Sequence, residues 1–252
     1  MMNLRALLHA GLFVLSLCAA GASARADCTD PAGVGGDIAF NAPYGAMMHC
    51  DGAVWQSWAK QERNYSATAM LFDGTNTYIR QNAIPDVTDS KMVTGSVWIK
   101  RNATGAIHNI FAINDRFIFR VTSAGQIAMV AENASDTDIL DMVTTANVVA
   151  DTNWHHVIFS IDMGNSANNR IYVDGVSAAL SYSINTDAVI DFSVTQYAVG
   201  AVYAGTNKFN GMMSDLWIDV GRFVDLTVAA NREKFRSSAG LPQYLGVSGE
   251  RP

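Results

Sequence analysis

The chain has 252 residues, of which 49% are hydrophobic and 16% are charged, and its formal net charge is −6. This composition is typical of one large packed domain or of two smaller ones. The acidic balance, without a basic cluster, argues against a nucleic-acid partner. Three cysteines are too few for a cysteine-rich scaffold.

Residues 1–26 have the features of an export signal. Arg5 supplies a positive charge, an apolar run that includes Leu12–Leu15 follows, and Ala24–Ala26 provides small residues at the −3 and −1 positions of a cleavage site. This pattern predicts a cut before Asp27. An uncleaved anchor is the alternative, although the apolar run is short for a membrane span. No second apolar segment is long enough to cross a membrane, so we expect a secreted, periplasmic or cell-surface protein.

The three cysteines divide between the signal and the mature chain. Cys18 lies in the signal, and a lipoprotein anchored there is an alternative, although Leu17 stands where a small residue is usual. Cys28 and Cys50 remain after cleavage. In an oxidising compartment we expect them to form one disulfide, and two unpaired thiols are the alternative.

Residues 27–60 form a small β unit in this interpretation. A turn-rich opening precedes short expected strands at 38–40, 46–50 and 54–58. Such a unit is too small to hold a core unaided, so the disulfide would have to stabilise it. The pattern C…P-x-G…C-D-G-x-x-W, from Cys28 to Trp55, resembles a short cysteine-linked motif that precedes surface and fibre domains in bacterial and phage proteins.

Residues 66–245 are rich in strand signals separated by turn-rich gaps, and no long helical pattern interrupts them. This favours an all-β, two-sheet antiparallel sandwich of the jelly-roll type. Alternation is clean in 116–121, where the two phenylalanines, Phe117 and Phe119, share one face with Val121. The expected strands are 69–72, 77–80, 96–101, 107–113, 116–121, 126–131, 139–144, 154–162, 170–174, 196–202 and 212–220.

One short helix is expected near the C-terminus, over residues 228–236. Asp225 or Thr227 would cap its start, because short polar side chains accept hydrogen bonds from the first free N–H groups of a helix. Gly240 and Pro242 lie beyond its end and would stop it.

The most informative segment is Trp154–Gly175. It opens with the run W-H-H-V and ends with Y-V-D-G, where Asp-Gly is a strong signal for a hairpin turn. These two runs resemble the signature of laminin-G-like domains, which belong to the concanavalin A-like lectin and glucanase superfamily. Further segments resemble the family pattern in the same order: Phe72–Ile79, Val97–Lys100, Val199–Gly200 and Phe209–Ile218.

The resemblance implies a concanavalin A-like sandwich over 66–245. Family members with a similar C-terminal segment usually continue into a short final strand, whereas this chain has only the tail 246–252. Either the sequence is truncated there, or that strand is dispensable.

The resemblance also implies a cofactor, since many laminin-G-like domains bind Ca²⁺ at the rim of the sandwich. Asp73 and Asp215 occupy matching positions, and Ca²⁺ takes carboxylate oxygens as ligands. Ser214 replaces an aspartate of the family pattern, which argues against calcium. The alternative is that both aspartates cap turns.

Enzyme activity is not expected. Related glucanases use a strand with E-x-D-x-x-E, and no glutamate of this chain lies in that pattern. Asp136 and Asp138 are interpreted as part of an acidic loop. His155 and His156 are adjacent on a strand, so they point to opposite faces and are unsuited to bind one metal ion together.

Sugar recognition usually combines an aromatic face with polar hydrogen-bonding groups. Tyr203 and Asn207 lie on an expected loop, and Trp217 would face outward if Leu216 and Ile218 face the core. These three residues, Tyr203, Asn207 and Trp217, are the candidate ligand contacts, and ordinary packing is the alternative for the aromatic ones.

Two functions follow from these observations. The favoured one is a secreted, non-catalytic binding module that recognises carbohydrate or a cell-surface partner. The alternative is a structural or assembly protein of a surface fibre, an envelope or a phage-like particle, which the cysteine-linked motif favours.

Overall fold

The computed structural model describes residues 28–29, 32–33, 36–41, 46–50, 55–57, 67–82, 87–246, 249 and 252. The chain divides into two compact units between Asn64 and Tyr65. The expected export signal, residues 1–26, lies outside the described residues. None of the helices in the described ranges has the length and apolar character needed to span a membrane.

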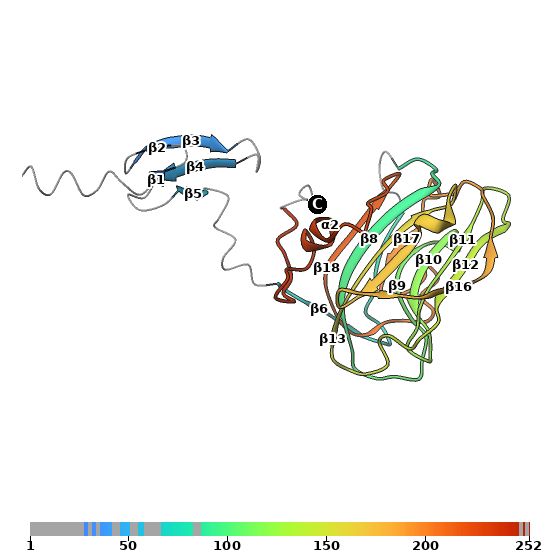
Figure 1. Cartoon of the computed structure of the whole chain (residues 1–252). Helices are drawn as coiled ribbons and strands as arrows, with labels where there is room; N and C mark the ends of the chain where they lie inside the picture. Colours follow the sequence, from blue (N-terminus) through green and yellow to red (C-terminus); the bar gives the residue numbers. More distant parts are fainter. Residues whose placement is uncertain are drawn as a thin grey trace, which may run out of the picture. The chain divides into compact units, whose positions relative to one another are not determined.

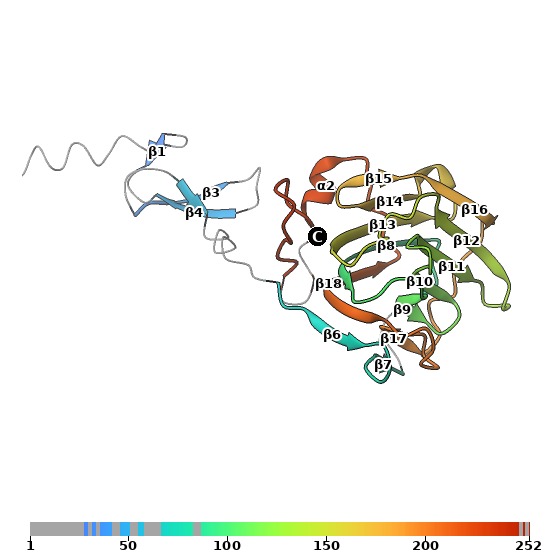
Figure 2. The same cartoon turned by 90° about the horizontal axis from the view of Figure 1, so that it is seen from below.

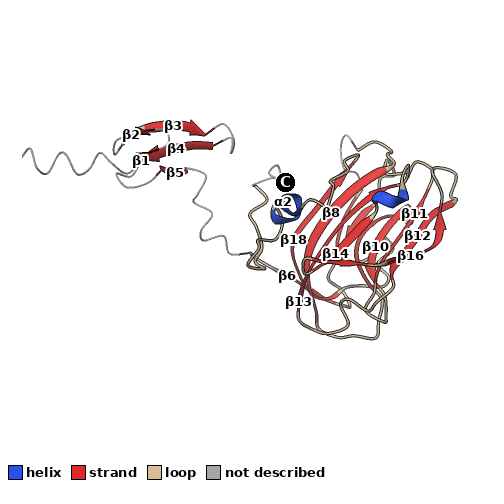
Figure 3. Cartoon of the chain, viewed as in Figure 1, coloured by secondary structure: helices blue, strands red, loops and turns tan. Residues whose placement is uncertain are grey.

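The N-terminal unit consists of short antiparallel strands (Figure 3). A disulfide closes it. The Sγ atoms of Cys28 and Cys50 are 2.02 Å apart and both residues are buried, which confirms the expected bond. The N–H group of Cys50 also donates to the carbonyl of Asp37 at 2.8 Å. The strands are β1 (Cys28–Thr29) paired with β2 (Ala32–Gly33), and a sheet of β3 (Ile38–Asn41), β4 (Ala46–Cys50) and β5 (Trp55–Ser57).

The second unit consists of two antiparallel sheets (Figures 1 and 2), which confirms the expected all-β sandwich. The six-stranded sheet has the order β15 (Val176–Ala178), β14 (Arg170–Val173), β13 (Trp154–Asp162), β8 (Met92–Arg101), β18 (Asn210–Val220) and β6 (Met70–Asp73). The seven-stranded sheet has the order β16 (Leu180–Asn185), β12 (Asp138–Thr144), β11 (Ile127–Glu132), β10 (Phe117–Val121), β9 (His108–Ile113), β17 (Tyr197–Val199) and β7 (Ile79–Gln81). A short 3-10 helix, η4 (Ser166–Asn168), joins β13 to β14.

The core lies between the inner faces of the two sheets. Phe117 and Phe119 of β10 point inward as the alternation predicts, and their ring centroids lie 6.2 and 4.9 Å from that of Phe159 on β13. Gly95 on β8 leaves room for Phe159, because a Cβ atom there would lie 2.5 Å from its ring. The apolar alternation of the sequence therefore specifies this interface between the sheets.

The C-terminal segment, residues 222–246, covers part of the outer face of the six-stranded sheet. Phe235 is 2% exposed, and its ring centroid lies 5.1 Å from that of Trp217 on β18. The backbone N–H of Val224 lies 3.1 Å from the hydroxyl oxygens of Thr94 and Ser160, on β8 and β13. Apolar packing and hydrogen bonds thus attach this segment to the sheet.

The helix in this segment is shorter than expected and is capped differently. It is α2 (Ala229–Glu233), and Val228 at its N-cap makes no side-chain cap hydrogen bond. Asp225 instead accepts from the backbone N–H of Thr227 at 2.9 Å and from its hydroxyl at 2.6 Å. The expectation that Asp225 or Thr227 caps the helix is therefore wrong, because these two side chains stabilise the preceding turn.

Candidate functional site

One carboxylate joins the two halves of the signature segment. Asp174, in the turn after β14, lies 2.7 Å from Nδ1 of His155 and accepts from the backbone N–H of His156 at 2.9 Å. Asp151 lies 2.9 Å from the other ring nitrogen of His155. The hydrogen bond with Asp174 is the main cause that raises the pKa of His155. Both ring nitrogens of His155 thus contact carboxylates, and these contacts give the histidine a structural role.

His156 lies on the outer face of the six-stranded sheet. Its Nε2 atom is 2.8 Å from Oγ of Ser96, and its ring centroid is 4.9 Å from that of Trp98. Burial lowers the pKa of His156 to about 3, and the charge of Arg236 acts in the same direction. The two adjacent histidines therefore diverge, as strand alternation predicts. Within the described ranges, no group of three or more His, Cys, Asp and Glu side chains is placed to hold a metal ion.

An apolar pocket, called the tryptophan pocket below, opens beside Trp98 and has a volume of about 290 Å³. Strands β8, β13 and β18 each provide one wall residue, and the ends of two loops provide the others. Its lining consists of Ala67, Ala69, Trp98, Trp154, Ser214, Gly240, Leu241 and Pro242. The C-terminal segment thus contributes to this pocket as well as covering the sheet.

Two features suit the tryptophan pocket to a ligand. The indole Nε1 of Trp98 is buried and has no hydrogen-bond partner among the described residues, and such a donor costs free energy unless something accepts from it. Trp154 is 38% exposed and Leu241 is 62% exposed, so apolar surface of the lining residues remains accessible to solvent. Apolar walls with a few polar groups are typical of small-molecule sites.

Tyr203 belongs to a second surface, which we call the tyrosine cluster: Tyr78, Arg80, Asn82, Tyr203 and Lys208. The Tyr203 hydroxyl donates to Asn82 at 2.6 Å, and the Arg80 guanidinium carbon lies 5.6 Å from the Tyr203 ring centroid. Lys208 Nζ lies 5.7 Å from the Tyr78 ring centroid. Strand β7 and the loops beside it thus bring together residues that are far apart in the sequence.

Asn207 lies next to this cluster on the loop before β18. Its side chain is exposed, its φ angle is 49°, and its carbonyl accepts from the N–H of Asn109 at 3.0 Å. The sequence placed Tyr203 and Asn207 on one loop correctly, but it did not indicate that Tyr78 and Arg80 would lie beside them.

Trp217 lies on the outer face of the six-stranded sheet but is covered. It points away from the core, as the alternation with Leu216 and Ile218 predicts, yet it is only 9% exposed. The C-terminal segment covers it, and its Nε1 donates to the carbonyl of Gly249 at 2.9 Å. The outward direction of the ring is confirmed, but the C-terminal segment covers that face of the sheet.

Comparison with known proteins agrees with this architecture. A family profile described as the concanavalin A-like lectin/glucanases superfamily matches residues 73–219, more than half of the chain. The chain belongs to the concanavalin A-like superfamily. No curated protein is significantly similar to it.

Solved structures similar to this concanavalin A-like chain include a pentraxin and a sialidase domain. One is a native heptameric SAP-like pentraxin from Limulus polyphemus, with 15% identity over 63% of this chain and 78% of that chain, and a TM-score of 0.47. Another is the CBM40 domain of the Ruminococcus gnavus IT-sialidase bound to α2,3-sialyllactose. It has 14% identity over 65% of this chain and 97% of that chain, and a TM-score of 0.47.

The calcium pair expected from this superfamily is not assembled. Asp73 pairs with Asn210 at one end of β6, whereas Ser214, next to Asp215, bonds the carbonyl of Thr68 at the other end. The two aspartates are thus separated by roughly 15 Å along the strand. Since Ca²⁺ needs six to eight oxygens around one point, these two carboxylates cannot share one ion.

Asp73 also has another role in the structure. Its Oδ1 accepts from the backbone N–H groups of Thr75, Asn76 and Thr77 at 2.7–2.8 Å. These bonds, the one from Thr77 first, hold the pKa of Asp73 far below its usual range. The carboxylate therefore caps the turn after β6, which is the alternative that the sequence left open.

Three acidic side chains gather around Arg116. Glu132 lies 2.6 Å from the Arg116 guanidinium, and Asp191 lies 3.2 Å from it. Asp136, in a turn with a φ angle of 56°, also pairs with Arg116. These acids neutralise one arginine on the outer side of β10, so they are bound in a structural ion-pair network.

Proposed function

We propose that the chain is an exported, non-catalytic carbohydrate-binding module and that one sugar ring binds in the tryptophan pocket. The observation that carries this proposal is the buried, unpartnered indole N–H of Trp98 in an apolar pocket with a second indole, Trp154. A pyranose has apolar C–H faces that pack on aromatic rings, and its hydroxyl oxygens accept from an N–H donor.

The size of the tryptophan pocket supports a single ring. Its volume of about 290 Å³ is at the lower end of the range for small-molecule sites. Trp154 provides exposed aromatic surface for stacking, and Ser214 lies among the lining residues as a hydroxyl group. A long oligosaccharide would therefore contact the protein mainly through one of its sugar units.

The tyrosine cluster, with Tyr203 and Asn207, is the competing surface. Its aromatic rings already lie near the cationic groups of Arg80 and Lys208. A sugar that stacks on these rings would have to displace those contacts, which costs part of the binding free energy. For this reason we assign the sugar to the tryptophan pocket.

The test is a screen of the mature chain, residues 27–252, on an array of neutral and acidic glycans with Ca²⁺ and with EDTA. Titration calorimetry of the best glycan then compares the wild type with Trp154→Ala and Tyr203→Ala. We expect at least a tenfold loss of affinity for Trp154→Ala and little change for Tyr203→Ala, with unchanged unfolding temperatures.

Other outcomes are equally informative. Loss for Tyr203→Ala alone would move the sugar to the tyrosine cluster and overturn the pocket assignment. A wild-type chain that binds no glycan in either buffer would overturn the proposed function and favour the assembly role. Release of reducing sugar from the bound glycan would contradict the non-catalytic part of the proposal.

A further inference from the structure

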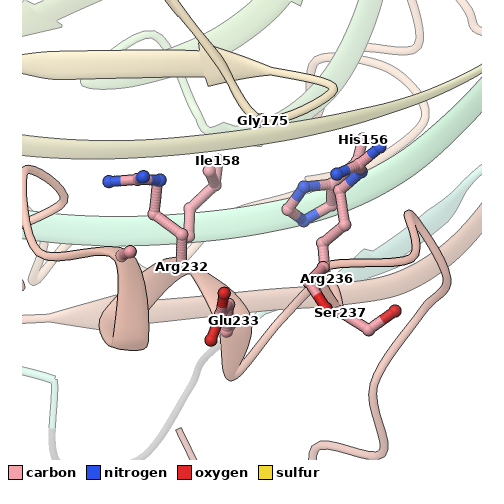
Figure 4. Close-up of a pocket in the computed structure, with 9 residues that line it drawn as sticks. His156, Ile158, Gly175, Arg232, Glu233, Arg236 and Ser237 are labelled. Carbon is pink, nitrogen blue, oxygen red and sulfur yellow. The ribbon is translucent and has the colours of Figure 1, made fainter.

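A second pocket, called the arginine pocket below, lies between the outer face of the six-stranded sheet and the C-terminal segment (Figure 4). Its volume is about 130 Å³, which suits one small chemical group. Strand β13, the turn after β14 and α2 with the residues that follow it provide its walls. The lining residues are His156, Ile158, Gly175, Ala229, Arg232, Glu233, Arg236, Ser237 and Ser238.

The two arginines of this pocket have no acidic partner among the described residues. None of the salt bridges there, counted to 4.0 Å, contains Arg232 or Arg236. The Nε atom of Arg236 is buried, and the residues that the structure describes provide no hydrogen-bond partner for it. A guanidinium that is partly removed from water without a partner costs free energy, which a bound anion would recover.

The neighbouring carboxylates do not neutralise this charge. The pKa of Asp174 is lowered: burial acts to raise it, whereas the hydrogen bonds of its two oxygens with His155 and the N–H of His156, and last the charge of Arg236, act to lower it. Figure 4 shows that the guanidinium of Arg236 lies beside the ring of His156. The carboxylate of Glu233 points away from this guanidinium in the same view. Neither carboxylate therefore forms an ion pair with Arg236 in the part of the chain that the structure describes.

Arg232 and Arg236 differ in whether their guanidinium N–H groups already donate hydrogen bonds to the protein. Arg232 lies 4.5 Å from the ring centroid of Tyr172 and donates to the carbonyls of Leu226 and Thr227. For Arg236, the Nε atom lacks a hydrogen-bond partner within the described ranges. Arg236 is therefore the donor that remains available to a ligand, whereas Arg232 adds charge.

The glycine of the signature's Asp-Gly turn, Gly175, leaves room for the side chain of Arg236. A Cβ atom on Gly175 would lie 3.1 Å from Nη1 of Arg236, and the φ angle of this glycine is 84°. Glycine in the Asp-Gly turn thus lets the guanidinium lie close to the backbone. Ser237 accepts from the N–H of Leu241 at 3.0 Å, so its hydroxyl hydrogen is left as a donor.

We infer that the arginine pocket binds one oxyanion group of the sulfate type. Arg236 supplies the charge-assisted hydrogen bonds, and the hydroxyls of Ser237 and Ser238 supply neutral donors. The group is either the free ion or a sulfate ester on a larger molecule, since both present the same oxygens. This inference is independent of the sugar proposed for the tryptophan pocket.

The experiment measures thermal unfolding and calorimetric titration of the mature chain in sodium sulfate, against sodium chloride at equal ionic strength. We expect a saturable rise of the unfolding temperature with sulfate beyond that with chloride. Arg236→Gln should abolish this extra rise, and Lys234→Gln should keep it. Lys234 is exposed, lies beside α2 and does not line the pocket. Lys234→Gln therefore removes one positive charge, as Arg236→Gln does, but from outside the pocket.

A second variant covers the case in which Arg236→Gln does not fold. Ser238 is exposed, so Ser238→Ala should leave the basal unfolding temperature unchanged and weaken sulfate binding severalfold. A sulfated disaccharide that binds at least tenfold more tightly than inorganic sulfate would identify an ester, and equal affinity would identify the free ion. Equal effects of sulfate and chloride on the wild type, or an unchanged sulfate effect in Arg236→Gln, would overturn the inference.

Discussion

His155 and Asp174 are 19 residues apart in the chain, yet Nδ1 of the imidazole and Oδ2 of the carboxylate lie 2.7 Å apart. This contact joins the start of β13 to the turn after β14, and Asp174 also accepts from the N–H of His156. The W-H-H-V and Y-V-D-G halves of the family signature are therefore parts of one hydrogen-bonded hairpin.

The His155 contact predicts a loss of stability as the pH rises above neutral. The pKa of His155 is raised, mainly by the hydrogen bond with Asp174, so folding favours the protonated ring. Its stabilising effect is complete below the ordinary pKa of about 6.5 and disappears as the pH rises through the folded value. Urea unfolding at pH 6 and pH 8 should show a larger cost of His155→Gln at pH 6. Equal costs at both values would contradict the assigned contact.

The two buried histidines predict the opposite dependence in acid. Burial lowers the pKa of His108 to about 4 and that of His156 to about 3. Below pH 6.5 the unfolded chain takes up these protons first, so each histidine lowers stability by at most about 1.4 kcal/mol per pH unit. His108→Met should flatten the stability profile between pH 6.5 and 4.5. The His155→Gln variant is the control. Below pH 6.5 it should lower the stability by a constant amount, so the slope of the profile there should stay that of the wild type.

The C-terminal segment should be part of the cooperative fold. Phe235 is 2% exposed and packs on Trp217, so Phe235→Ala should cost about 3 kcal/mol in the free energy of unfolding. Leu241 lies in the same segment but is 62% exposed, and Leu241→Ala should change stability by less than about 0.5 kcal/mol. Chemical unfolding followed by tryptophan fluorescence measures both values. A Phe235→Ala variant as stable as the wild type would mean that the segment is not attached in solution.

Arg101 is expected to reduce stability. It is 2% exposed and its Nη2 donates to the carbonyl of Val149, but its Nε and Nη1 atoms find no hydrogen-bond partner in the described part of the chain. A buried guanidinium whose hydrogen-bonding capacity is not satisfied is costly, and replacing it by an apolar side chain of similar length removes that cost. Arg101→Met should be as stable as the wild type or up to about 2 kcal/mol more stable. Destabilisation in a urea titration would show that the guanidinium has a partner in solution.

Local patterns predicted the scaffold well, because each depends on neighbours in the sequence. The alternation in 116–121 placed Phe117 and Phe119 in the core. Strand β16 was not predicted, because serine and asparagine alternate there with half-buried residues such as Leu180 and Tyr182. Edge strands of this kind bury little apolar surface, so the hydrophobic pattern that marks a strand is weak.

The candidate sites were predicted less well, because they depend on contacts between distant segments. Trp217 faces away from the core as expected, but the alternation does not indicate that Phe235 covers it. The register of β6 against β18 separates Asp73 from Asp215, although both match the calcium positions of the family pattern. Trp98 and Leu241 meet in one pocket only because the C-terminal segment folds back onto the sheet.

The most direct test of the account is the indole N–H resonance of Trp98 during a titration with monosaccharides. A ¹⁵N-labelled mature chain would be titrated with glucose, galactose, mannose, N-acetylglucosamine and sialic acid, and Trp98→Phe would assign the resonance. We expect the Trp98 signal to shift and saturate with at least one of these sugars, because its unpartnered Nε1–H gains an acceptor. A sugar that binds while this signal stays unchanged would contradict the placement of the sugar in the tryptophan pocket.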